Sequence, residues 1–158
     1  MLIVSSAMHK LFIAILFFAF VSCVEEDHFI HYSYDGVTIT RVDRGNDIGF
    51  YYGNYNSRNI LPNANIKVSY RGFDGFVDGY LVFKEDKIVK IVPMGGLFKT
   101  VSASDVFKIE EFNNNIDFIK WEDKFKGNYH NIYRISNIKK AEIERNKENK
   151  TAVKAIYN

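Results

Sequence analysis

Apolar and polar residues alternate in short runs along most of the chain after residue 27, with the period of two that is typical of β-strands. In residues 66–71, for example, Ile66, Val68 and Tyr70 alternate with polar side chains, so one face of this segment is expected to be buried. Gly, Asn, Asp and Pro separate the runs and mark turns. The expected strands include residues 29–34, 37–43, 48–52, 66–71, 80–84, 87–92, 106–112, 116–121 and 129–136.

Turn residues indicate how the first strands connect. Asp35-Gly36 stands between two apolar-rich runs and predicts a two-residue hairpin, because both turn positions need a positive φ. Residues 44–47 then join the second run to a third. About ten short strands with frequent turns predict a mainly β fold, a single antiparallel sandwich or barrel-like domain over residues 28–158.

The C-terminal segment permits two structures. Residues 138–150 are rich in helix-forming residues, which favours a helix. Their apolar positions form no clean helical stripe, so a final hairpin of residues 140–145 and 150–157 is equally compatible with the pattern.

The N-terminal segment reads as a targeting signal. Leu11 to Val21 is an unbroken apolar run of 11 residues, preceded by His9 and Lys10 and followed by the small residue Ser22. A membrane-spanning helix needs about 20 apolar residues. A secretory signal instead has a positive region, a shorter apolar run and a small residue before the cleavage site, as this segment does. Residues 1–22 are therefore expected to be a signal peptide, with translation starting at Met8 or Met1.

Phe20-Val21-Ser22-Cys23 resembles the lipobox of bacterial lipoproteins, with Phe20 where that family usually has Leu. In that family the Cys thiol carries diacylglycerol and a dedicated peptidase cuts before it. The resemblance implies that Cys23 is the lipid attachment site, palmitate included, and the first mature residue. Residues 23–27 would then be an acidic tether to the membrane.

Glu25 and Glu26 follow Cys23 closely. A similar acidic pair is found in surface-displayed lipoproteins of Bacteroidota, which implies an outer membrane lipoprotein at the cell surface. The alternative is that these acids only keep the tether solvated, with the domain facing the periplasm.

Composition narrows the function classes. The chain has 158 residues with 21 basic and 19 acidic side chains, a net charge of +2 that argues against nucleic acid as a partner. Its only cysteine excludes an intramolecular disulfide. Aromatic residues make up 16% of the chain, and in two stretches they lie beside polar residues. The candidate ligand contacts are Tyr51, Tyr52, Tyr55 and Arg58 in the first, and Phe73, Asp74, Phe76, Asp78 and Tyr80 in the second.

The spacing of the histidines and carboxylates gives little support to a catalytic or metal site. His28 and His31 are three apart, so on a strand they point to opposite faces and cannot share a zinc ion. Asp74 and Asp78 do not match an EF-hand loop. Glu110-Glu111 and Glu122-Asp123 are acid pairs, but adjacent strand residues diverge. We therefore expect no catalytic residues, no metal and no cofactor.

These observations favour a lipid-anchored envelope protein with a binding or structural role towards a protein, glycan or envelope component. Two alternatives stay open, an immunity-type lipoprotein that blocks a secreted toxin and a small hydrolase.

Overall fold

The computed structural model describes residues 26–45, 47–69, 77–95, 97–102, 105–112, 115–123, 130–136 and 139–157. The predicted signal peptide, Cys23 and the candidate contacts Phe73, Asp74 and Phe76 lie outside these residues.

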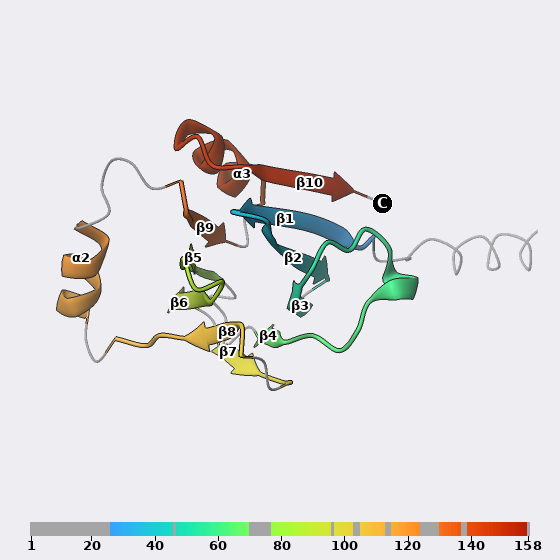
Figure 1. The fold of residues 1–158 in the computed structure, drawn as a ribbon, viewed down its shortest axis with the longest axis horizontal. Coiled ribbons are helices and arrows are strands. Elements are labelled where there is room, and N and C mark those ends of the chain that lie inside the picture. Colours follow the sequence, from blue (N-terminus) through green and yellow to red (C-terminus); the bar gives the residue numbers. More distant parts are fainter. Residues whose placement is uncertain are drawn as a thin grey trace, which may run out of the picture.

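The described residues form two facing β-sheets (Figure 1). Sheet A has the strand order β10-β1-β2-β3-β4-β7, and all of its neighbours are antiparallel. Its first three strands in the sequence follow one another as a meander, as the turn residues predict. The strands of sheet A are β1 (His28–Tyr34), β2 (Val37–Arg44), β3 (Asp47–Tyr52), β4 (Ile66–Ser69), β7 (Leu97–Thr100) and β10 (Val153–Tyr157).

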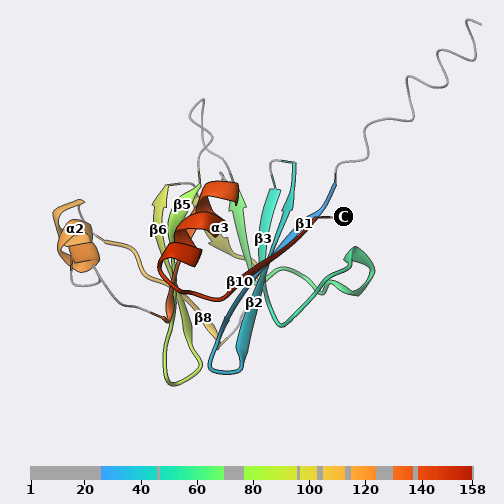
Figure 2. The ribbon, with the colours of Figure 1, turned by 90° about the horizontal axis from the view of Figure 1, so that it is seen from above.

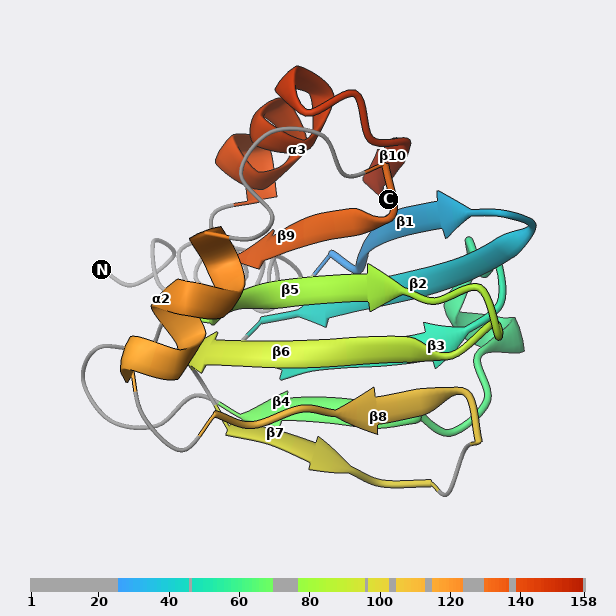
Figure 3. The ribbon, with the colours of Figure 1, turned by 60° about the vertical axis from the view of Figure 1, so that its left-hand side comes forward.

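Sheet B has the order β8-β6-β5-β9 and lies in front of sheet A in Figure 3. The expected strands at 80–84 and 87–92 are confirmed by β5 and β6, which form an antiparallel hairpin. The predicted strand at 106–112 is shorter, because only β8 pairs, and it runs parallel to β6 rather than antiparallel. The strands of sheet B are β5 (Asp78–Phe83), β6 (Val89–Gly95), β8 (Phe107–Ile109) and β9 (Ile132–Ser136).

Figure 2 shows the two sheets face to face, and one hydrophobic core fills the space between them. Sheet A contributes Ile30, Ile39 and Phe50, and sheet B contributes Leu81 and Ile91, all fully buried. The prediction of a mainly β fold is confirmed, and the arrangement is a sandwich rather than a closed barrel. A short 3₁₀ helix, η1 (Arg58–Ile60), lies in the loop between β3 and β4.

The Asp35-Gly36 hairpin forms as predicted. Asp35 has φ 46° and Gly36 has φ 75°, so both turn residues are left-handed. This is the type I′ geometry whose twist matches that of the flanking strands.

The predicted strand at 116–121 is wrong, because these residues belong to the helix α2 (Asn115–Asp123). Phe118 and Trp121 are one helical turn apart, and both pack on Tyr80 of β5. Ile116 and Ile119 remain 64% and 53% exposed. The apolar residues of segment 116–121 therefore lie on two sides of a helix, with Phe118 and Trp121 against Tyr80 and Ile116 and Ile119 exposed.

At the C-terminus both alternatives are partly correct, since the helix α3 (Lys139–Glu148) is followed by the strand β10. Lys150 ends α3 with φ 58°. The Lys150 amide donates to the carbonyl of Lys147 at 3.0 Å and the Thr151 amide to that of Asn146 at 2.9 Å. This pair of bonds is a Schellman motif, which closes a helix and turns the chain.

Asn146 explains why α3 lacks an apolar stripe. Its side chain accepts from the Arg134 amide at 3.0 Å and donates to the Arg134 carbonyl at 3.1 Å. The side-chain amide thus replaces a neighbouring strand at the open edge of β9, and α3 covers that edge (Figure 3). Glu142 and Asn146 are the buried residues of α3, one turn apart, so its buried face is polar.

Within the described residues, no helix is both long and apolar enough to cross a membrane.

Candidate functional site

The outer face of sheet A, the side away from the core, carries a row of polar side chains. Alternation along β1 places His31 and Ser33 on this face, opposite Ile30 and Tyr32. The strand register sets Thr40 beside His31 on one side and Lys154 on the other. His28 shares the inward face, so the two histidines point to opposite sides, as their spacing predicts.

The hydrogen bonds of Thr40 determine which nitrogen of the neutral His31 ring carries the proton. The Thr40 hydroxyl donates its single proton to the Gly53 carbonyl at 2.6 Å and accepts from the Tyr55 amide at 3.0 Å. It has no second proton for the His31 ring, 3.1 Å away. His31 Nδ1 must therefore donate, which leaves Nε2 unprotonated in the neutral ring.

His31 Nε2 is buried and has no hydrogen-bond partner among the described residues. The whole residue is 5% exposed. Burial lowers the pKa of His31, and the positive charge of Lys154 lowers it further. The ring is thus held neutral, and its Nε2 is a hydrogen-bond acceptor that no described residue uses. Leaving a buried polar atom without a partner costs free energy, so such an atom calls for an explanation, and a bound ligand that donates to it is one.

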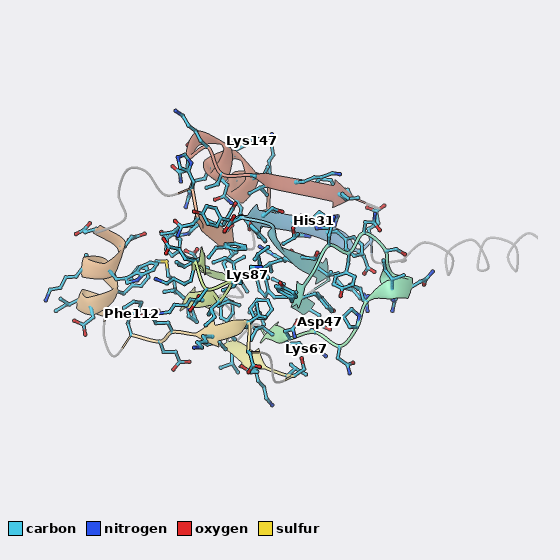
Figure 4. The ribbon with its side chains drawn as sticks, viewed as in Figure 1. His31, Asp47, Lys67, Lys87, Phe112 and Lys147 are labelled. Atoms are coloured by element: carbon cyan, nitrogen blue, oxygen red, sulfur yellow. The ribbon has the colours of Figure 1, made fainter. Side chains whose placement is uncertain are left out.

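A pocket of about 230 Å³ opens beside this ring. The hydroxyls of Ser33 and Thr38, 2.9 Å apart, form part of its wall. Figure 4 labels His31 on the side of the molecule where β1 and β10 lie. The lining residues are His31, Ser33, Thr38, Asn54, Ala152, Val153 and Lys154.

The first predicted aromatic group is brought together only in part. The Tyr51 and Tyr55 rings meet edge to face at 6.2 Å. Tyr51 also lies over Gly49, where a Cβ would come within 2.9 Å of its ring. Tyr52 projects from the other side of β3, and Arg58 is exposed on η1. The Tyr55 backbone amide donates a hydrogen bond to the Thr40 hydroxyl, which lies beside His31, but Tyr55 does not line the pocket.

The second predicted group is engaged in internal packing where it is described. Arg134 of β9 lies over the Tyr80 ring at 4.8 Å and bonds to Asp78 and to the Tyr80 hydroxyl. The Tyr80 hydroxyl also donates to Glu122 of α2. Burial, followed by this bond to Glu122, raises the pKa of Tyr80 to about 12.

The described residues of the two predicted groups lie near different ends of the molecule. In Figures 1 and 2, η1 is at one end of the molecule and α2 is at the other. Figure 4 labels Phe112 beside α2, far from His31.

The acid pairs also have structural partners. Glu110 forms an ion pair with Lys90 at 2.8 Å, and Glu122 belongs to the cluster around Tyr80. His130 is exposed beside β9. Among the described residues, no three His, Cys, Asp or Glu side chains are grouped so that they could hold a metal ion.

A buried ionic network occupies the inner face of sheet A. Arg41, 0% exposed, contacts Asp43 at 2.6 and 2.7 Å and Glu142 of α3 at 2.5 Å. The Tyr32 hydroxyl also donates to Glu142. The Ser136 amide donates to Glu142 at 2.8 Å. These contacts fasten α3 to both sheets, so we assign this network a structural role.

Comparison with known proteins adds no relative, since no family model, no curated protein and no solved structure matches this chain.

Proposed function

We propose that this protein is a lipid-anchored component of the bacterial cell envelope whose β-sandwich binds a small ligand on the outer face of sheet A. The observation that carries the binding role is the buried Nε2 of His31, which has no hydrogen-bond partner in the described part of the chain and lies beside a pocket of about 230 Å³. Ligand pockets commonly combine a largely preformed cavity with a few fixed polar groups.

The anchor follows from the lipobox-like sequence ending at Cys23. A single acyl chain holds a protein only marginally, whereas two or three chains on one residue give lasting attachment. Asp27, four residues after Cys23, is fixed to the domain by its ion pair with Arg44 at 2.7 Å. Four extended residues span at most about 14 Å, so a membrane-held Cys23 would keep the sandwich close to the lipid surface.

Substitution of the cysteine tests the anchor. We expect Cys23→Ala to abolish palmitate labelling and to release the protein from the membrane fraction. Ser22→Ala is the matched control, because alanine keeps a small residue at that position and labelling should persist. Labelling that survives in Cys23→Ala would contradict the anchor. Protease treatment of intact cells then distinguishes surface display, where the domain is cleaved, from a periplasm-facing domain, which is protected.

The binding role is tested separately on the full-length protein in detergent. A ligand that binds only the folded state raises the Tm in proportion to the logarithm of its concentration. We expect the low-molecular-mass fraction of an envelope extract to raise the Tm of the wild type and not that of His31→Phe. An equal rise in both proteins, or none in either, would contradict binding at this pocket.

A further inference from the structure

The groups around the pocket differ in what they can offer a ligand. His31 Nε2 can only accept a hydrogen bond, because Nδ1 carries the ring proton. Lys154 supplies a positive charge and donors only, and it is the single charged side chain among the lining residues described. Asn54 offers both a donor and an acceptor. A complementary ligand therefore needs a hydroxyl for His31 and a negative charge for Lys154.

We propose, building on the binding role above, that this pocket binds a small hydroxylated anion of the acidic-sugar type. Its negative group pairs with Lys154, and one of its hydroxyls donates to His31 Nε2. The Ser33 and Thr38 hydroxyls and Asn54 contact the remaining oxygens, while Ala152 provides a small apolar contact.

The size of the pocket limits the ligand to about one ring. A volume of about 230 Å³ is below the range of about 300–1,000 Å³ found for drug-sized ligands. A monosaccharide carrying a carboxylate or phosphate fits this limit. A longer glycan can be recognised here only through one residue, for example its acidic end.

Binding requires a local movement, since Nε2 has almost no exposed surface of its own. Besides Ala152, the exposed lining side chains are Asn54, on a loop, and Lys154, on the edge strand β10. Both can change conformation without disturbing the core. As the anion enters, the Lys154 ammonium follows it and the ring nitrogen gains its partner.

The preference for an anion follows from the same groups. A neutral sugar of equal size would leave the Lys154 charge without a partner, and a cation would be repelled by it. Pairing of the Lys154 ammonium with a negative group of the ligand is therefore expected to raise the affinity for an anion about tenfold over that for a neutral sugar.

The test uses the full-length protein in detergent, with glucuronate as the probe and glucose as the neutral control. Titration calorimetry should show saturable binding of glucuronate, at least about tenfold tighter than that of glucose. Lys154→Met should weaken glucuronate binding by about tenfold or more. Lys147→Met, an exposed lysine of α3, should leave it unchanged.

Nitrogen-15 NMR of the wild type provides a second readout that needs no variant. The free protein should show His31 as the Nδ1-protonated neutral tautomer, and glucuronate should shift the Nε2 resonance. No saturable glucuronate binding, equal affinity for glucose, or an unshifted Nε2 resonance would overturn this ligand class. If the envelope extract still raises the Tm through His31 in that case, the proposed binding role stands and only the ligand class fails.

Discussion

Replacing Arg41 by Met tests whether the buried ionic network fastens α3 to the sandwich. The substitution removes three contacts of 2.5–2.7 Å and leaves the carboxylates of Asp43 and Glu142 inside the protein. Removing one partner of a buried ion pair costs about 3–5 kcal/mol, mainly because the remaining charge loses its compensation. We expect Arg41→Met to lower the free energy of unfolding at neutral pH by this amount.

Urea denaturation followed by circular dichroism measures the loss. With an m value of about 2 kcal/mol/M, the unfolding midpoint should fall by about 2 M. Arg145→Met is the control, since Arg145 is exposed on α3 and should change the stability by no more than about 0.5 kcal/mol.

The pH dependence separates this explanation from a simple loss of packing. Without Arg41, burial holds the pKa of Glu142 above its unfolded value. The deficit is then fully present at pH values above that raised pKa, and it shrinks as the pH falls and the carboxyl becomes protonated. Cavity formation alone would give a deficit that does not depend on pH.

A double variant provides the last check. Arg41→Met with Glu142→Gln removes both charges of the pair and keeps a side-chain oxygen that can accept from Tyr32 or the Ser136 amide, while Asp43 keeps Lys139 at 3.4 Å. The double variant should therefore recover part of the stability that the single variant loses. A single-variant loss below about 1 kcal/mol, or a double variant less stable than Arg41→Met, would refute the reasoning.

Three further predictions concern single residues. Since burial lowers the pKa of His31, NMR titration of the ring should give a midpoint below the ordinary value of 6.5. Protonation then favours the unfolded state, so the contribution of His31 to stability should be lost as the pH falls from 6.5 through the lowered pKa. A midpoint above 6.5 would contradict this. Asn146→Leu leaves the Arg134 amide and carbonyl unpaired and should cost about 2–4 kcal/mol in urea unfolding, whereas Asn149→Leu, on an exposed position, should cost far less. Lys150→Gly relieves a positive φ of 58° at the end of α3 and should raise the stability by up to about 1 kcal/mol, so a lower Tm would argue against the Schellman geometry.

The candidate site was only partly accessible to sequence reasoning. The ligand contacts expected at Tyr51, Tyr52, Tyr55 and Arg58 stay a prediction, and the pocket is lined instead by Asn54, which lies between them in the sequence. His31, however, reads in the sequence as an ordinary strand histidine. Its importance depends on Thr40 and Lys154, which neighbouring strands bring alongside it.

What the sequence determined by itself was local in origin. The period of two and the turn chemistry of Asp35-Gly36 predicted the strands and the first hairpin, because a strand buries one face and a type I′ turn needs two left-handed residues. These preferences act between close neighbours in the chain, so they are visible in the sequence alone.

Only the tertiary structure decided the features that depend on distant partners. Arg41 and Glu142 are 101 residues apart and Tyr32 and Glu142 are 110 apart, yet they share one buried network. Buried polar groups are stable only when such partners satisfy them. The helix α2 likewise depends on Tyr80 of β5, which receives Phe118 and Trp121. No local pattern specifies these pairings, since the energy that selects them arises only when the two sheets and both helices come together.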